Sequence, residues 1–180
     1  MLRDFKKTRL PSLSERATII IDGITYEEDL TSGGAADLPD ALAEKVGILD
    51  YKTLRYPGHY AWVDEQRCGL GNTREAIAAL QQKMEALIPH IEDDKIILYA
   101  AVEGKDKEGT LYRREISKQI LPQTVGRHPL RAIQIATAAP LLQSAQLLLE
   151  SLSSGVVLQS QIDPKPFLNG NFIVPVYGKI

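Results

Sequence analysis

Two residues, Asp22 and Gly23, separate a pair of β-rich runs near the start of the sequence. An Asp-Gly pair suits a two-residue turn in which both positions need positive φ, so residues 17–28 predict a β-hairpin. A second pair of runs, 96–102 and 111–120, flanks the charged turn 104–109 and predicts another hairpin. The residues before Pro57-Gly58, from 49 to 56, predict a further strand.

Three segments carry helix signals. Residues 38–46 predict a short helix with Asp37 as N-cap and Pro39 in the first turn. Asn72 and Glu75 have the spacing of a capping box and precede apolar residues at helical spacing. The core stripe predicted for that second helix consists of Ile77, Leu80, Met84 and Leu87.

The third helix is predicted over residues 129–153, opened by Pro129. The segment is apolar almost all round, which is typical of a buried helix, and Pro140 inside it predicts a kink or a break. Residues 156–158 and 172–176 are short strand candidates. Because strands and helices do not alternate regularly, we expect an α+β fold, a mixed or antiparallel sheet packed against helices, rather than a doubly wound one.

Length and composition point to one ordinary globular domain. The chain has 180 residues and a formal net charge of −2, which gives no reason to expect nucleic acid or an anionic membrane as a partner. We expect residues 1–16 to be a polar lead-in segment, frayed and solvated, and 17–180 to be a single domain. The single cysteine, Cys68, excludes an internal disulfide and fits a reducing compartment. No run of about 20 apolar residues and no signal peptide is evident, so we expect a cytoplasmic protein.

The segment most suggestive of chemistry is Tyr51 to His59. Alternation along a strand places Lys52 on one face and Arg55 on the other, and the Pro-Gly turn brings the strand end to an edge of the sheet. The Arg55 guanidinium could bind a carboxylate through two parallel hydrogen bonds, and His59 could donate a hydrogen bond or carry a proton. The competing interpretation is a sheet edge with a surface ion pair and a solvated histidine.

The octapeptide KTLRYPGH, residues 52–59, resembles a signature of the saccharopine dehydrogenase-like family, which includes lysine 6-dehydrogenase and carboxynorspermidine dehydrogenase. Residues 23–34 resemble that family's hairpin and turn, and residues 131–139 resemble the start of its long helix. Residues 155–170 resemble the exit from that helix, so the resemblance covers roughly residues 17–177. It implies the domain that binds the amino-acid substrate and forms a homodimer.

The resemblance also implies roles for individual residues. His59 and Lys52 would be catalytic neighbours of the substrate. The substrate-binding residues would be Arg55, Thr31, Ser32, Gly33, Gln134 and Thr137. The family's reaction transfers hydride between NAD or NADP and a carbon that bears an amine, with the cofactor carrying the hydride.

The chain departs from the family in its cofactor site. A Rossmann fingerprint needs three glycines after a strand, and Gly69, Gly71 and Arg74 supply only two of them with no hydrophobic strand before them. We therefore expect no nucleotide-binding domain and no cofactor bound by this chain alone. The histidines are widely spaced and share one cysteine, so we expect no metal site.

Three functions remain open at this point. The first is the substrate-binding domain of an NAD(P)-dependent amino-acid dehydrogenase, which we expect to be inactive without its nucleotide-binding partner domain. The second is a non-catalytic dimerisation or binding module derived from that family. The third, an unrelated enzyme that uses His59 or Cys68 directly, lacks any assembled set of further catalytic groups.

Overall fold

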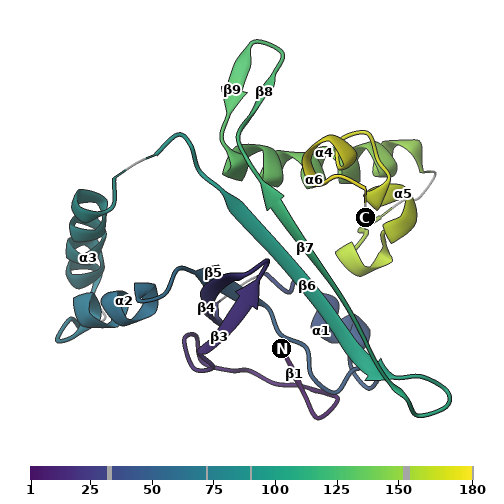
Figure 1. Cartoon of the computed structure of the whole chain (residues 1–180), viewed down its shortest axis with the longest axis horizontal. Helices are drawn as coiled ribbons and strands as arrows, with labels where there is room; N and C mark the ends of the chain where they lie inside the picture. Colours follow the sequence, from purple (N-terminus) through teal and green to yellow (C-terminus); the bar gives the residue numbers. More distant parts are fainter. Residues whose placement is uncertain (32–33, 72, 90, 152–154, 180) are drawn as a thin grey trace. The chain divides into compact units, whose positions relative to one another are not determined.

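The computed structural model of the chain describes residues 1–31, 34–71, 73–89, 91–151 and 155–179. The predicted site residues Ser32 and Gly33 and the predicted cap Asn72 lie outside the described residues. The chain divides into two compact units (Figure 1). Unit 1 comprises residues 1–8, 35–49 and 92–180, and unit 2 comprises residues 9–34 and 50–91.

Unit 2 consists of one antiparallel sheet in the order β3-β4-β5, followed by two helices. The predicted hairpin is confirmed: Asp22 and Gly23 have φ of 50° and 79°, and Ile21 pairs with Ile24 across the turn. The elements are β3 (Ala17–Ile21), β4 (Ile24–Leu30), β5 (Lys52–Arg55), α2 (His59–Arg67) and α3 (Arg74–Leu87).

The buried residues of unit 2 come from this sheet and from the start of α2. Ile21, Tyr26, Leu30 and Tyr60 are at most 4% exposed. The α3 helix forms where the apolar spacing predicts it, but Thr73 is its N-cap and accepts a hydrogen bond from the backbone N–H of Ala76. None of its residues is buried, so the predicted core stripe of α3 is not covered.

Unit 1 contains three two-stranded antiparallel sheets and four α-helices among its described residues. Its elements are β1 (Leu2–Arg3), β2 (Lys6–Lys7), α1 (Leu38–Leu42), β6 (Ile96–Lys105), β7 (Leu111–Ile120), β8 (Gln123–Val125), β9 (His128–Leu130), α4 (Ala132–Glu150), the 3-10 turn η1 (Gln159–Gln161), α5 (Pro164–Leu168) and α6 (Val174–Tyr177).

The long hairpin β6-β7 confirms the second predicted hairpin. Its turn is held by Asp106, whose side chain accepts hydrogen bonds from the backbone N–H groups of Glu108 and Thr110. At the other end of the hairpin, Ile120 packs with Ala132 and Ile135 of α4 in the core of unit 1. The core of unit 1 therefore joins the end of β7 to the first turns of α4.

The start of the chain is ordered by pairing, which overturns the expectation of a frayed lead-in. Asp4 and Phe5 form the turn between β1 and β2 with positive φ. Leu2 is fully buried and exchanges backbone hydrogen bonds with Leu49. The polar composition of residues 1–16 gives no indication that Leu2 is buried and fixes the start of the chain.

The long helix also differs from its prediction. Pro129 lies in β9, and α4 starts at Ala132, where both carboxylate oxygens of Asp94 accept backbone N–H groups of the first turn. Pro140 does not split the helix, and only Ala132, Ile135, Ala139 and Gln143 are buried. The prediction of a helix buried all round is therefore wrong.

Two predicted strands near the C-terminal end are also wrong, and one helix is shorter than predicted. Residues 156–158 belong to no strand, and residues 174–177 form α6. The predicted helix 38–46 ends at Leu42. Short apolar runs do not distinguish a strand from a helical turn, because packing decides between them.

The fold class is α+β, as predicted, with antiparallel strands throughout the described residues. The strands are distributed over four small sheets rather than one. By length and composition alone, the 19-residue helix α4 could also cross a membrane, contrary to the expectation that no segment would, although a helix of a soluble protein can meet the same criteria. The structure is compatible with a soluble protein.

Candidate functional site in unit 2

Pairing between β4 and β5 sorts the signature residues onto two faces of the sheet. Glu27 is opposite Arg55 and Asp29 is opposite Thr53, so these four side chains share one face. Lys52 lies on the other face, where its Nζ is 2.9 Å from an Oε1 of Glu28. The alternation expected from the sequence is therefore present.

The turn after β5 brings the first residues of α2 back to the face that carries Arg55. Gly58 has φ of 91°, a conformation that favours glycine, and is the N-cap of α2. Glycine has no side chain that could cap the helix; instead the carboxylate of Glu27 accepts hydrogen bonds from the backbone N–H groups of Gly58 and Tyr60. A carboxylate at a helix N-terminus is stabilised by the exposed N–H groups and the helix dipole.

Glu27 thereby leaves the guanidinium of its cross-strand neighbour available. Arg55 is exposed and its Nη1 donates to the carbonyl oxygen of Leu54 at 2.9 Å. Among the described residues, no carboxylate forms an ion pair with Arg55. The guanidinium can therefore offer further N–H donors to an anionic group.

His59, the first residue of α2, lies close enough to Arg55 for their charges to interact. Partial burial, together with the positive charge of Arg55, lowers the pKa of His59, and the carboxylate of Glu27 opposes this shift only in part. The shift favours the neutral imidazole, in which one ring nitrogen can accept a proton while the other donates a hydrogen bond. The rings of Tyr60 and Trp62 lie beside it, with centroids 5.6 and 6.4 Å away.

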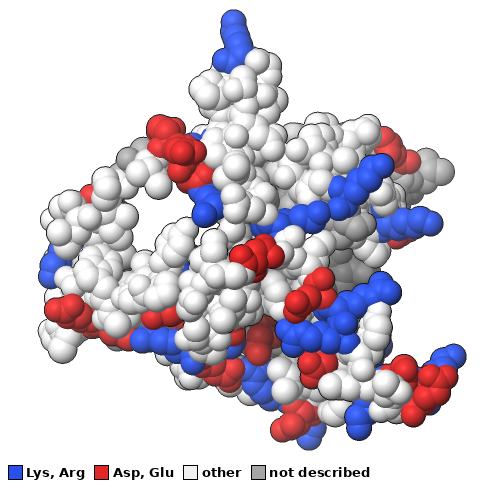
Figure 2. All heavy atoms as spheres, in the orientation of Figure 1, with Lys and Arg blue, Asp and Glu red and all other residues white. Residues whose placement is uncertain are grey.

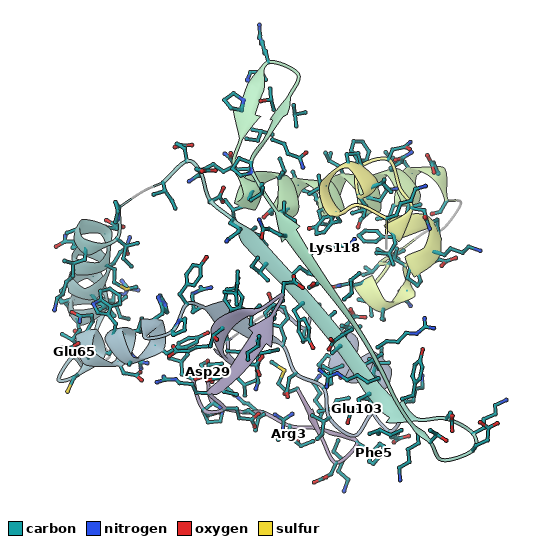
Figure 3. All side chains as sticks on the ribbon, viewed as in Figure 1. Arg3, Phe5, Asp29, Glu65, Glu103 and Lys118 are labelled. Carbon is teal, nitrogen blue, oxygen red and sulfur yellow. The ribbon has the colours of Figure 1, made fainter. Side chains whose placement is uncertain are left out.

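A buried carboxyl group on the same face links the sheet to α2. Asp29, labelled in Figure 3, has no exposed surface. Its carboxylate accepts hydrogen bonds from the backbone N–H groups of Glu15 and Leu30 and from Arg16. The Arg16 guanidinium also pairs with Asp64 of α2 at 2.8 Å and lies over the ring of Tyr60. This network fixes α2 against the sheet, and the Tyr60 hydroxyl completes the attachment by donating to the carbonyl oxygen of Thr53.

The remaining predicted site residues have different positions. Thr31 shares the face of Arg55, and its hydroxyl lies 2.6 Å from that of Thr53. Gln134 and Thr137 belong to α4 in unit 1, where both side chains bond to their own helix: Gln134 accepts from the N–H of Arg131, and Thr137 donates to the carbonyl oxygen of Ile133. The structure thus brings Arg55 and His59 close together in unit 2, with Thr31 on the same face but at the other end of β5, and Lys52 on the opposite face of the sheet.

A hollow of about 530 Å³ lies elsewhere in unit 2, between α2 and α3. It is lined by Asp64, Arg67, Cys68, Leu70, Gly71, Ala76, Ile77 and Leu80. None of the predicted substrate-binding residues lines it. Cys68, at the C-cap of α2, is exposed.

Sequence reasoning missed the supporting residues of the site. Glu27 caps α2 and Glu28 pairs with Lys52. Asp29 and Arg16 were not among the predicted site residues. The available signal was the alternation itself, which places Asp29 on the face of Thr53 and Arg55, although it could not show that α2 folds over that face.

Comparison with models of known protein families and with curated proteins finds no match to this chain. Among the residues that the structure describes, no group of three His, Cys, Asp or Glu side chains is placed to hold a metal ion.

The residues present do not fit a nicotinamide dinucleotide in the manner of a Rossmann domain. Such a site places a glycine-rich turn between a strand and a helix. Here the turn with Gly69 and Gly71 connects helix α2 to helix α3, and Gly69, with φ of 76°, follows the end of α2. No catalytic step through that cofactor is therefore assigned to this chain.

Proposed function

We propose that this chain is the substrate-binding domain of an NAD(P)-dependent amino-acid dehydrogenase of the saccharopine and lysine dehydrogenase type, cytoplasmic and homodimeric. The observation that carries the proposal is the exposed Arg55 guanidinium, with no carboxylate partner among the described residues, close to His59 at the start of α2. The resemblance of residues 52–59 to the family signature supports the same assignment.

In this proposal Arg55 binds the substrate carboxylate through two N–H donors and fixes its orientation. His59 faces the amine-bearing part of the substrate and holds or accepts a proton from it, which its neutral state permits. Thr31 adds a hydroxyl at the same face. The nicotinamide, which supplies the hydride chemistry, is held by a separate nucleotide-binding domain.

A change in melting temperature tests ligand binding by this chain. We expect lysine, saccharopine or carboxynorspermidine to raise the melting temperature of the wild-type chain, because a ligand that binds only the folded state stabilises it. Arg55→Ala should abolish the shift, and Arg55→Lys should retain less than half of it, since a lysine cannot make the paired hydrogen bonds. Arg74→Ala, an exposed arginine on α3, is the matched control and should leave the shift unchanged.

Equal shifts in the wild-type chain and Arg55→Ala would refute the role of Arg55. The absence of a shift with all three ligands, with and without NAD(P), would favour the second candidate, a dimerisation or binding module without catalytic function. One observation favours that candidate specifically: α4 in unit 1 carries a broad exposed apolar face.

A further inference from the structure

The side of α4 that faces away from the core of unit 1 is almost entirely apolar. We call it the outer face of α4; it consists of the exposed residues Ile133, Gln134, Thr137, Ala138, Leu141, Leu142, Ala145, Leu148 and Leu149. Leu141 is 69% exposed and Leu149 is 87% exposed. Monomeric soluble proteins rarely expose a contiguous patch of this kind, so the outer face of α4 requires an explanation.

The opposite side of α4 is attached to unit 1 by specific contacts. Gln143 is buried and accepts the backbone N–H of Phe172, and Tyr177 donates its hydroxyl to the carbonyl oxygen of Ala136. Asp94 caps the first turn. Insertion of α4 across a bilayer would break all of these contacts, so the outer face is better satisfied by a partner that docks on it.

The outer face has the spacing of a helix-pairing seam. Gln134, Ala138, Leu141, Ala145 and Leu148 follow one another at alternating steps of four and three residues, and all five are exposed. This is the a/d spacing at which helices pack side by side. Alanine and leucine alternate along it from Ala138 to Leu148, so small and large side chains succeed each other.

That alternation makes the seam complementary to a copy of itself. If two α4 helices run antiparallel about a two-fold axis level with Gln143, Leu141 lies opposite Ala145 of the second copy, and Ala138 lies opposite Leu148. A large side chain then meets a small one at each level, as close packing requires. A two-fold axis repeats each such pair, because an isologous interface uses the same patch on both copies.

Charge also permits this pairing. Residues 132–149 include no Asp, Glu, Lys or Arg, so two copies of the outer face bring no like charges together. The blue and red atoms that Figure 2 draws therefore belong to segments other than residues 132–149. A partner recognised by charge would find no complementary group on this face.

We propose that the outer face of α4 is a homodimer interface, in which α4 packs antiparallel against α4 of a second copy of this chain. The proposal names the surface for the homodimer in the proposed function, and it does not depend on amino-acid binding by unit 2.

Sedimentation velocity on the full chain tests the interface. We expect the wild-type chain to be a dimer at about 100 µM, and Leu141→Glu to raise the dimer dissociation constant by about a hundredfold or more, because two carboxylates would enter an apolar seam. Ile20→Glu is the matched control, since Ile20 is also 69% exposed but lies on β3 of unit 2. Circular dichroism should show that both variants keep the wild-type fold.

A cysteine experiment tests the geometry without a disruptive charge. In a Cys68→Ser background, a mixture of Leu141→Cys and Ala145→Cys chains should form the mixed disulfide more readily than either chain forms a disulfide with itself. A parallel pair would instead favour the Leu141→Cys self-disulfide, and that result would overturn the proposal.

Further outcomes would also overturn it: a wild-type chain that is monomeric at about 100 µM, a Leu141→Glu chain that dimerises as tightly as the control, or a monomer that binds phosphatidylcholine vesicles through α4. Ligand binding is scored separately. Arg55→Ala should remain dimeric, and Leu141→Glu should retain any ligand-induced rise in melting temperature, so failure of one proposal is distinguishable from failure of the other.

Discussion

Asp29 shows at the scale of single residues how unit 2 accommodates a charge inside its core. Its carboxylate has no exposed surface and receives two backbone N–H groups as well as the guanidinium of Arg16. Asp64 pairs with the same arginine but is about half exposed. The two carboxylates therefore differ in burial and in the backbone N–H groups that only Asp29 receives.

Replacing each carboxylate by an amide should separate the two contributions. We expect Asp29→Asn to lower the free energy of unfolding by about 1 to 3 kcal/mol, because a buried acceptor of three hydrogen bonds becomes partly a donor. Asp64→Asn should cost no more than about 1 kcal/mol, as for other exposed ion pairs. Urea denaturation of both variants measures the difference, and equal losses would contradict the role assigned to burial.

His59 gives unit 2 a defined pH dependence. Because partial burial and Arg55 lower the pKa of His59 in the folded chain, the unfolded chain binds the proton more readily. The contribution of His59 to stability is therefore present above the ordinary histidine pKa of about 6.5 and is lost as the pH falls through the folded-state pKa. NMR titration of His59 in the folded and urea-unfolded chain checks this; a folded value equal to or above the unfolded one would refute it.

At the scale of helices and strands, the sequence predicted those elements whose turns or caps are local. The hairpin at Asp22-Gly23 and the hairpin β6-β7 were found because their turn residues are adjacent in sequence. The start of α4 was missed because its cap, Asp94, is 38 residues away from Ala132. The same limit explains the site: Arg55 and His59 were predicted from a contiguous motif, whereas Glu27 acts on α2 from a different strand.

The distant cap leads to a prediction for α4. Asp94→Ala should lower the free energy of unfolding by about 0.5 to 2 kcal/mol, the usual cost of losing an N-cap side chain, since two N–H groups lose their acceptor. Asp93→Ala is the matched control, because Asp93 is the exposed neighbour in sequence, and it should change stability by less than about 0.5 kcal/mol. Thermal denaturation followed at 222 nm checks both; equal effects would mean that Asp94 does not cap α4 in solution.

At the scale of the whole molecule, the division into two units predicts more than one unfolding event. Each unit has its own buried residues, with Asp29 in unit 2 and Ile120, Ala132 and Ile135 in unit 1. Independent cores unfold with their own free energies, so a single two-state transition is not expected. The contiguous sequence motifs did not predict this division, because unit 1 is assembled from three separate stretches of chain.

Calorimetry of the two variants described above tests the division. We expect two overlapping heat-absorption peaks, with Asp29→Asn shifting one of them and Asp94→Ala shifting the other, each by several degrees. A single peak that both variants shift together would show that the two units unfold as one cooperative body.

The interleaved order of the units has a consequence for synthesis on the ribosome. All of unit 2 has been made once residue 91 is in place, whereas unit 1 still lacks residues 92–180. At about 5 to 20 residues per second, translation of the remaining 89 residues (180 − 91) takes roughly 4 to 18 seconds. During that interval unit 2 can fold, whereas unit 1 still lacks the core residues Ile120, Ala132 and Ile135, so the early stretches of unit 1 are exposed without the core that they later share.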